Sequence, residues 1–152
     1  MPTRYRGTQE EKRALDAYIK LQRASETVLT HTTRHLAGHG LSTSQFGILE
    51  ALYHLGTLSQ RDLAEKLLKS TGNISIVLKS LEKRGLVSRT RDPDDNRYMQ
   101  VCLTDAGRER LLGVLGEHVR GIVEEMSALS PTEQEELARL CRKLGLRESQ
   151  NS

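Results

Sequence analysis

The sequence predicts a mainly α-helical protein that carries one small β-hairpin. Apolar residues recur every three or four positions along most of the chain, and Ser or Thr residues suited to capping precede several of these stretches. Between residues 86 and 103, two runs with strand character flank a polar segment rich in turn-forming residues. The protein is therefore expected to be of the α+β class, with its hairpin inserted between helices.

The first predicted element is a long helix that runs from residue 10 to Gly38. Its apolar stripe extends from Leu15 to Leu36 and becomes less apolar towards its end. Residues 1–9 show no periodic apolar pattern and are expected to form an arm. A long helix with one apolar face favours packing against a second copy of the chain.

The second predicted helix begins with the clearest cap in the sequence. Ser42 and Gln45 have the spacing of a capping box, in which each side chain bonds a backbone N–H of the other residue. The helix continues to about Leu55. The following Thr57-Leu58 could add a short strand to the sheet of the hairpin.

Two short helices follow this one. Ser59 can cap the first, and Ser70-Thr71-Gly72-Asn73 is a polar cluster that favours a turn or a cap, so the chain is expected to change direction near Lys69. Gly85 ends the second short helix, because glycine readily takes the left-handed conformation. Its predicted buried stripe consists of Ile74, Val77, Leu78 and Leu81.

The hairpin comes next. Residues 86–91 and 98–103 are the predicted strands, and Asp92-Pro93-Asp94-Asp95-Asn96-Arg97 joins them. Helix, tight turn, helix and hairpin in this order are the layout of a winged helix-turn-helix, in which the hairpin is the wing. We therefore expect the second short helix to enter the DNA major groove and the wing to reach the DNA beside it.

The candidate DNA contacts are short polar or cationic side chains on these two elements. On the second short helix they are Ser70, Thr71, Asn73, Ser75 and Lys79, and on the wing they are Arg89, Arg91 and Arg97. Two alternatives are open for Arg89 and Arg91, which either reach the DNA backbone or pair with Asp92 and Asp94. Asp95 is expected to hold an arginine, since phosphate repels a carboxylate.

Charge supports the same segment. Residues 59–104 contain nine Lys or Arg and six Asp or Glu, whereas the rest of the chain contains 14 of each, so the whole net charge of +3 lies in this segment. A local excess of positive charge is the electrostatic footprint of a surface that binds a polyanion.

After the hairpin, Thr104 and Asp105 cap another long helix, and Ser130 and Glu133 open the last one with a capping box. The long helix contains several glycines, which indicate either close packing or a bendable helix. Its predicted inward residues are Leu111, Leu115, Val119, Ile122 and Met126. We therefore expect residues 1–152 to form a single domain, with a DNA-binding lobe at 42–104 and dimerisation helices at 10–38 and 105–146.

Two motifs make a family resemblance specific. Asp95-Asn96-Arg97, followed after five residues by Leu103-Thr104, resembles the D-x-R-x5-L-T signature of the multiple antibiotic resistance regulator (MarR) family. The segment 81–87, Leu-Glu-Lys-Arg-Gly-Leu-Val, is similar to the end of that family's recognition helix. The resemblance spans roughly residues 10 to 146. It implies that Arg97 lies at the tip of the wing for insertion into the minor groove.

This resemblance implies a homodimeric transcriptional regulator, a repressor that binds double-stranded DNA at a pseudo-palindromic operator. Two recognition helices would enter successive major grooves about 34 Å apart. A small-molecule effector between the dimer helices and the winged lobe would change that spacing. The predicted ligand pocket contains His35, His39, Phe46, Tyr53 and His118.

Other readings stay open at this point. His31, His35 and His39 would form one row if the helix persists to Gly38, and some MarR members sense zinc, although we predict no metal site here. Cys102 and Cys141 are expected to be reduced thiols in packing roles, which disfavours a redox sensor. A helical protein-interaction module without DNA binding is the remaining alternative.

The sequence contains no Gly-rich phosphate loop, nucleophile elbow or metal-protease histidine pair. We therefore expect no enzymatic activity and no cofactor. No apolar run has the length of a membrane span, and the first residues are too polar for a signal peptide. The expected location is the cytoplasm, with no membrane partner.

Overall fold

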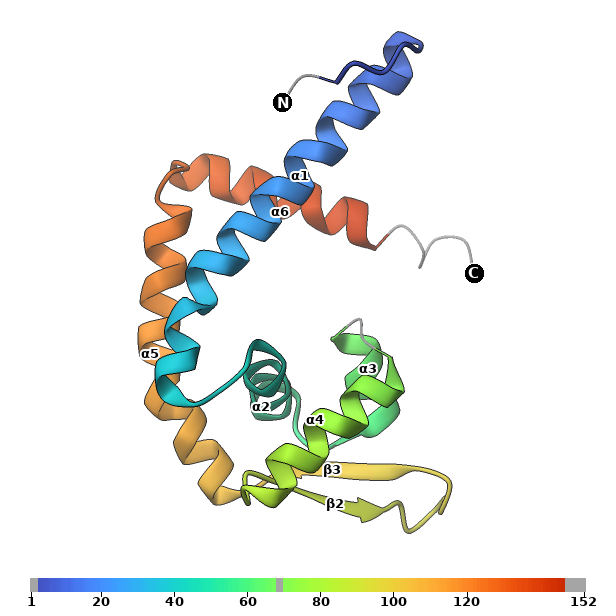
Figure 1. The fold of residues 1–152 in the computed structure, drawn as a ribbon, viewed down its shortest axis with the longest axis vertical. Helices are drawn as coiled ribbons and strands as arrows, with labels where there is room; N and C mark the ends of the chain where they lie inside the picture. Colours follow the sequence, from blue (N-terminus) through green and yellow to red (C-terminus); the bar gives the residue numbers. More distant parts are fainter. Residues whose placement is uncertain (1–2, 68–69, 147–152) are drawn as a thin grey trace. The chain divides into compact units, whose positions relative to one another are not determined.

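A computed structural model describes residues 3–67 and 70–146 of the chain. Lys69, where the chain is expected to change direction, lies outside this range. In chain order the described elements are α1 (Gln9–Thr33), the 3-10 helix η1 (Arg34–His39), α2 (Thr43–Leu55), β1 (Leu58–Ser59), α3 (Gln60–Lys66), α4 (Thr71–Lys83), β2 (Val87–Arg91), β3 (Met99–Leu103), α5 (Asp105–Met126) and α6 (Pro131–Gly145) (Figure 1). The predicted mainly helical fold with one hairpin is confirmed.

The chain divides into two compact units. Unit 1 comprises Met1–Thr32 and Val119–Ser152, and unit 2 comprises Thr33–His118. Every buried apolar side chain of the described residues lies in unit 2: Leu36, Leu41, Phe46, Ile48, Leu49, Leu52, Leu63, Ala64, Ile74, Leu78, Leu81, Leu86, Val87, Val101, Leu111 and Val114. Unit 2 extends beyond the lobe predicted at 42–104, because η1 and the first half of α5 contribute to this core.

The helices of unit 2 begin where local hydrogen bonds predict. The Ser42 hydroxyl accepts from Gln45 N, and the Gln45 side chain accepts from Ser42 N, so the capping box is complete. Ser59 caps α3 and Ser70 caps α4 in the same way, each through the backbone N–H three residues on. After α4, Gly85 has a φ of 73°, as its predicted role at the helix end requires.

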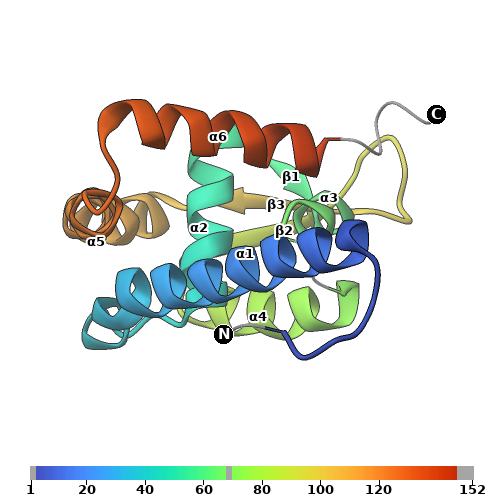
Figure 2. The ribbon, with the colours of Figure 1, turned by 90° about the horizontal axis from the view of Figure 1, so that it is seen from above.

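A three-stranded antiparallel sheet joins the helices of unit 2, in the order β1-β3-β2. The hairpin register pairs Val87 with Leu103 and Arg91 with Met99. Leu58 pairs with Val101, so the short strand predicted at Thr57-Leu58 exists, displaced by one residue. Figure 2 shows α2 crossing the strands of this sheet, with α4 beside it.

The first helix ends earlier than predicted. α1 stops at Thr33, and the chain tightens into η1 before Gly40 closes it in the left-handed conformation with a φ of 69°. One cause is local, since the Thr32 hydroxyl donates to Val28 O and competes with the helical backbone. Because a 3-10 helix has three residues per turn, the single row of histidines expected from an unbroken α-helix does not form.

Unit 1 has no apolar core of its own within its described residues, where Thr32 is the one buried residue. Its large apolar side chains are exposed: Tyr5, Tyr18, Leu21, Leu29, Val119, Ile122, Val123, Leu137, Leu140, Leu144 and Leu146. The predicted inward stripe of α5 is thus wrong for Val119 and Ile122 in a single protomer, because only the first half of α5 packs into unit 2. Among the described helices, none has the length and apolar character needed to cross a membrane.

Candidate nucleic-acid interface and ligand site

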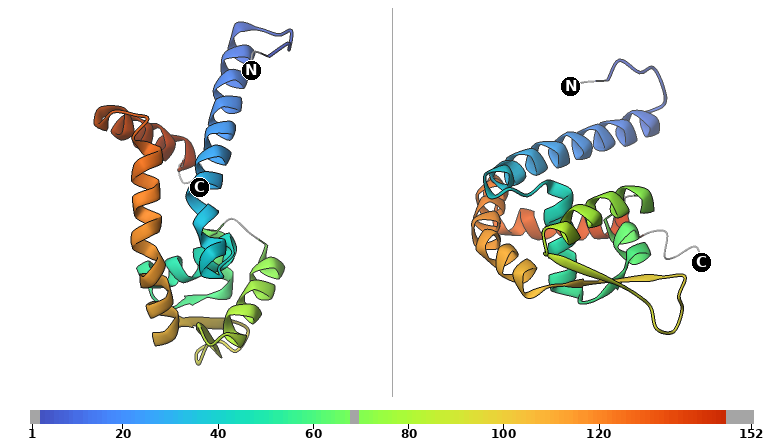
Figure 3. Two further views of the ribbon diagram at one scale, coloured as in Figure 1. Left: turned by 60° about the vertical axis from the view of Figure 1, so that its left-hand side comes forward. Right: turned by 60° about the horizontal axis from the view of Figure 1, so that its bottom comes forward.

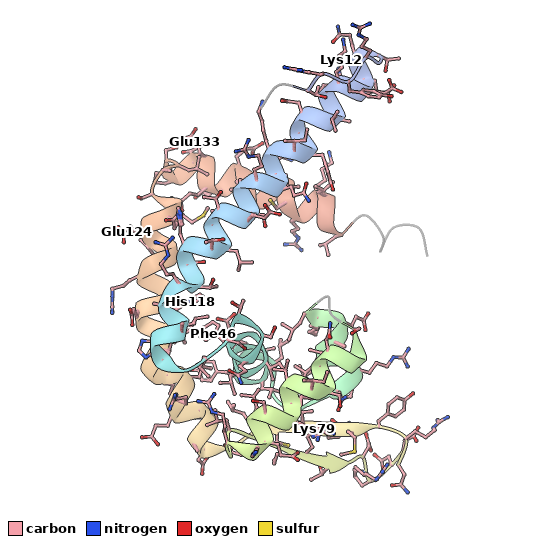
Figure 4. All side chains as sticks on the ribbon, viewed as in Figure 1. Lys12, Phe46, Lys79, His118, Glu124 and Glu133 are labelled. Atoms are coloured by element: carbon pink, nitrogen blue, oxygen red, sulfur yellow. The ribbon has the colours of Figure 1, made fainter. Side chains whose placement is uncertain are left out.

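Helix α4 presents a polar outer face next to the hairpin. Its exposed residues are Gly72, Asn73, Ile76, Lys79, Ser80, Glu82 and Lys83. Two predicted contacts, Asn73 and Lys79, are therefore exposed (Figure 4 marks Lys79). Ser75 is half-buried at the edge of this face, and the side chain of Thr71 lies outside the described part. Ser70 is exposed, but its oxygen already accepts from Asn73 N at 3.2 Å.

Among the exposed residues of α4 that were not predicted as contacts, one has a large apolar side chain. Ile76 is 70% exposed, because it lies off the buried stripe of Ile74, Leu78 and Leu81. The helical period contains this signal, since residue 76 cannot share a face with 74 and 78. The prediction overlooked it because only polar side chains were considered as contacts.

Two aspartates build the loop of the wing. Asp92 Oδ1 accepts from Asp94 N at 2.8 Å, and Asp95 Oδ1 accepts from Arg97 N at 3.1 Å. Each aspartate thus forms an Asx-turn with the backbone N–H two residues on. Asp92 Oδ2 also accepts from the Gln100 side chain. These hydrogen bonds favour the ionised carboxylates and lower the pKa of Asp92.

Arg97 forms a bidentate ion pair with Asp95. Arg97 Nη2 donates to Asp95 Oδ2 at 2.7 Å and Arg97 Nε donates to Asp95 Oδ1 at 3.0 Å. The Arg97 guanidinium lowers the pKa of Asp95 by these hydrogen bonds. The Arg97 side chain is nevertheless 82% exposed, and the loop that carries it extends past α3 and α4 (Figure 3, right). The pair orients the arginine and leaves its outer edge accessible.

The other two wing arginines have structural partners. Arg89 Nε donates to Glu82 Oε2 at 2.9 Å, its side chain is only 15% exposed, and this hydrogen bond lowers the pKa of Glu82. Arg91 Nη1 donates to Asn96 O at 2.8 Å. The predicted alternative of pairing with Asp92 and Asp94 is wrong, because Glu82 on α4 accepts from Arg89 and the Asn96 carbonyl accepts from Arg91. Arg89 ties the wing to α4.

Three of the five predicted pocket residues form one cluster within unit 2. The ring centroids of Phe46 and His118 are 4.5 Å apart, and those of His35 and His118 are 5.3 Å apart (Figure 4 marks Phe46 and His118). His35 Nε2 and His118 Nδ1 are buried and have no hydrogen-bond partner among the described residues. An unpaired buried polar atom costs free energy, so this cluster has unused hydrogen-bonding capacity.

The remaining two predicted pocket residues lie at or beyond the edge of this cluster. His39 lies 6.2 Å from His35, ring to ring, and its Nε2 is 2.8 Å from Glu117 Oε2. Tyr53 packs its ring against His54 at 5.1 Å and under the Arg108 guanidinium. The cluster of His35, Phe46 and His118 is therefore the core of the candidate ligand site.

The described residues contain no group of three or more His, Cys, Asp or Glu arranged to hold a metal ion. In unit 1, His31 Nδ1 lies 2.9 Å from Glu125 Oε1.

The expected packing role of the cysteines is wrong for Cys141, which is exposed in the protomer. Cys102 is half-buried, with its Sγ 3.3 Å from Thr57 Oγ1.

Comparison with known proteins supports the winged helix-turn-helix arrangement described above. A family model described as MarR family matches residues 39–97. YkoM of Bacillus subtilis, named an uncharacterized HTH-type transcriptional regulator, is 35% identical over 138 residues, which cover 91% of this chain and 90% of that relative.

Two solved structures share the fold. Sco3205, a MarR family regulator of Streptomyces coelicolor solved in complex with DNA, is 25% identical with a TM-score of 0.81, covering 93% of this chain and 90% of that chain. BpsR of Bordetella bronchiseptica, whose DNA binding is regulated by 6-hydroxynicotinic acid, is 24% identical with a TM-score of 0.78, covering 86% and 98%. The MarR family model that matches residues 39–97, together with the similarity to YkoM over nine-tenths of both proteins, shows that the chain belongs to the MarR family of transcriptional regulators.

Proposed function

We propose that the protein is a sequence-specific repressor that binds a pseudo-palindromic DNA operator as a homodimer and releases it when a small molecule binds. The observation that carries this proposal is the capped, exposed α4 beside a wing whose Arg97 is oriented by Asp95. Sco3205 was solved with DNA, which supports double-stranded DNA as the partner. The proposed role is binding without catalysis, and the proposed location is the cytoplasm.

The exposed apolar side chains of unit 1 support the homodimer. α1, the second half of α5 and α6 each expose several of them, and α6 exposes Leu137, Leu140 and Leu144 along one face. Burial of apolar surface stabilises association, and a chain with so little core in one unit gains it from a partner. A second copy is the partner that also matches a two-fold symmetric operator.

The proposed DNA contacts follow from exposure and charge. Asn73 and Lys79 on α4 face outward, where an amide pairs with an adenine edge and an ammonium with phosphate. Arg97 would enter the minor groove, whose negative potential attracts a guanidinium. Ser70 and Arg91 would add phosphate contacts, and Ser75 would lie at the rim. Arg89 supports the wing instead, because Glu82 already engages it.

The cluster of His35, Phe46 and His118 is the proposed effector site. A small molecule with hydrogen-bonding groups could satisfy His35 Nε2 and His118 Nδ1 while it packs on the Phe46 ring. The 6-hydroxynicotinic acid that regulates DNA binding by BpsR is a small molecule of this kind. Such a ligand would shift the conformational equilibrium only by its difference in affinity for the DNA-bound and free states.

Salt-dependent DNA binding tests the proposal. An operator is first selected from a random duplex pool, and its affinity is then measured over a range of salt concentrations. Lys79→Ala should weaken binding and flatten the logarithmic salt dependence by about 0.9 for each phosphate that the variant no longer neutralises. Lys20→Ala is the matched control, since this exposed lysine on α1 lies in unit 1 and pairs with Asp16.

Arg97→Ala provides the second arm. It should lower operator affinity more than it lowers affinity for unrelated duplexes, because the wing adds shape-dependent contacts. Unchanged operator affinity in both Lys79→Ala and Arg97→Ala would contradict the proposed surface.

A further inference from the structure

We propose that Ile76 reads the operator by packing against thymine methyl groups in the major groove. This inference rests on the proposed contact of α4 with DNA and adds a specificity-determining residue to it. It assigns an apolar contact to a surface otherwise explained by polar and cationic side chains.

The first observation is exposure. At 70%, Ile76 is the most exposed large apolar side chain of the described residues. Unit 2 exposes only two others within its described part, Leu55 at the end of α2 and Leu112 on α5. The remaining exposed apolar side chains lie in unit 1, where a dimer partner would cover them. Ile76 lies in neither the core of its own unit nor the proposed dimer surface.

The second observation is position. Ile76 lies four residues after Gly72 and three residues before Lys79, so these residues share one face of α4. Gly72 has no side chain to keep α4 away from a groove floor. Lys79 can anchor the same face to phosphate. A long apolar side chain between a glycine and a lysine would therefore point at the base edges once the helix is docked.

Helix formation does not explain this residue. A β-branched side chain loses χ1 freedom in a helix and has a lower helix propensity than Ala or Leu. With its neighbours Ile74 and Leu78 fully buried, Ile76 adds no core packing in return. A residue that contributes little to the fold and exposes its methyl groups is suited to a contact outside the chain.

The chemistry of the major groove identifies the ligand group. Thymine presents a C5-methyl group there, whereas cytosine presents an N4 donor and no methyl. Apolar contact with the methyl favours thymine, and an unpaired N4 donor against Ile76 would lose its hydrogen bonds to water. Ile76 would thus select A·T over G·C at its position of each half-site.

Thymine-to-uracil scanning of the selected operator tests this directly, because uracil lacks only the methyl group. For the unmodified protein, one symmetric pair of uracil substitutions should lower affinity by about fourfold for each buried methyl. Ile76→Ala removes the contact from both half-sites, so it should lower affinity for the thymine operator by at least about sixteenfold and become indifferent to uracil at that position. This non-additivity is the signature of a direct contact.

Two controls separate the possible failures. Leu55→Ala removes a comparably exposed apolar side chain from α2 and should change neither affinity nor uracil sensitivity. Ile76→Ala should not lower the melting temperature, since the residue has no core packing and Ala is the better helix former. It should keep the full salt dependence, since Ile76 has no charge.

The results that overturn the inference differ from those that overturn the proposed function. Suppose that Lys79→Ala weakens binding. If Ile76→Ala then has no effect, or lowers affinity equally for the thymine and uracil operators, Ile76 does not read a methyl group. If both variants bind like the unmodified protein with an unchanged salt dependence, the contact of α4 with DNA fails as a whole.

Discussion

Replacement of Gly107 by alanine should destabilise the protein although alanine is the better helix former. Gly107 is buried in the first turn of α5, where the helix packs against the backbone of Leu86 just after α4 ends. A Cβ at this position would overlap the Leu86 carbonyl oxygen and lie 2.8 Å from Leu103 Cδ1. The carbonyl oxygen belongs to the backbone, so the first turn of α5 must move.

The expected magnitude follows from the contacts that this movement disturbs. Overpacking costs about 1–3 kcal/mol. Lengthening the hydrogen bond from Thr104 N to Leu86 O, now 3.2 Å, adds about 1 kcal/mol. Alanine has a higher helix propensity than glycine, which offsets about 1 kcal/mol of this loss. The net loss of unfolding free energy is therefore about 1–3 kcal/mol, which lowers the melting temperature by about 2–4 °C per kcal/mol.

The assay is urea unfolding followed by circular dichroism, at one protein concentration because association changes apparent stability. Gly113→Ala is the matched control on the same helix, since a Cβ there meets nothing within 4 Å. It should stabilise by about 0.5–1 kcal/mol. The two substitutions are chemically identical. If they change the unfolding free energy in opposite directions, the close approach of Leu86 to Gly107 is the cause of the difference. A Gly107→Ala protein as stable as the unmodified one would refute the reasoning.

Two further predictions concern charge and assembly. Because the hydrogen bond from Arg89 lowers the pKa of Glu82 below its ordinary 4.5, this pair stabilises the fold above that pH and loses its effect as the pH falls through the lowered value. The stability difference between the unmodified protein and Glu82→Gln should therefore shrink in acid; a difference independent of pH would exclude the pair as its source. Val123→Glu places a charge on the 64% exposed apolar position of α5 and should weaken the proposed homodimer at least about tenfold in sedimentation, whereas Arg120→Glu should not. Equal effects of these two variants would remove Val123 from the interface.

Local chemistry made much of this fold predictable. The caps at Ser42, Ser59, Ser70 and Ser130 involve hydrogen bonds across three residues, so the sequence contains both partners. The wing loop is equally local, because its aspartates bond backbone groups two residues away. The order of these elements and the signature around Arg97 were sufficient to indicate the MarR family.

The tertiary structure decided what depends on distant neighbours. Gly107 and Gly113 are alike in sequence, and only the position of Leu86 distinguishes close packing from open space. The aspartates near Arg89 were plausible partners, but strand geometry brings it to Glu82.

The functional sites show the same difference between local hydrogen bonds and contacts with distant neighbours. The sequence by itself determined the caps, the wing, and therefore which helix is expected to face DNA, because each rests on short-range hydrogen bonds and the helical period. Tertiary packing alone decided that Ile76 is more exposed than any other large apolar side chain of the described residues. It also decided that His35 Nε2 and His118 Nδ1 are buried atoms without a hydrogen-bond partner in that part of the chain. Exposure and burial are properties of all the packed elements together, so no local pattern fixes them.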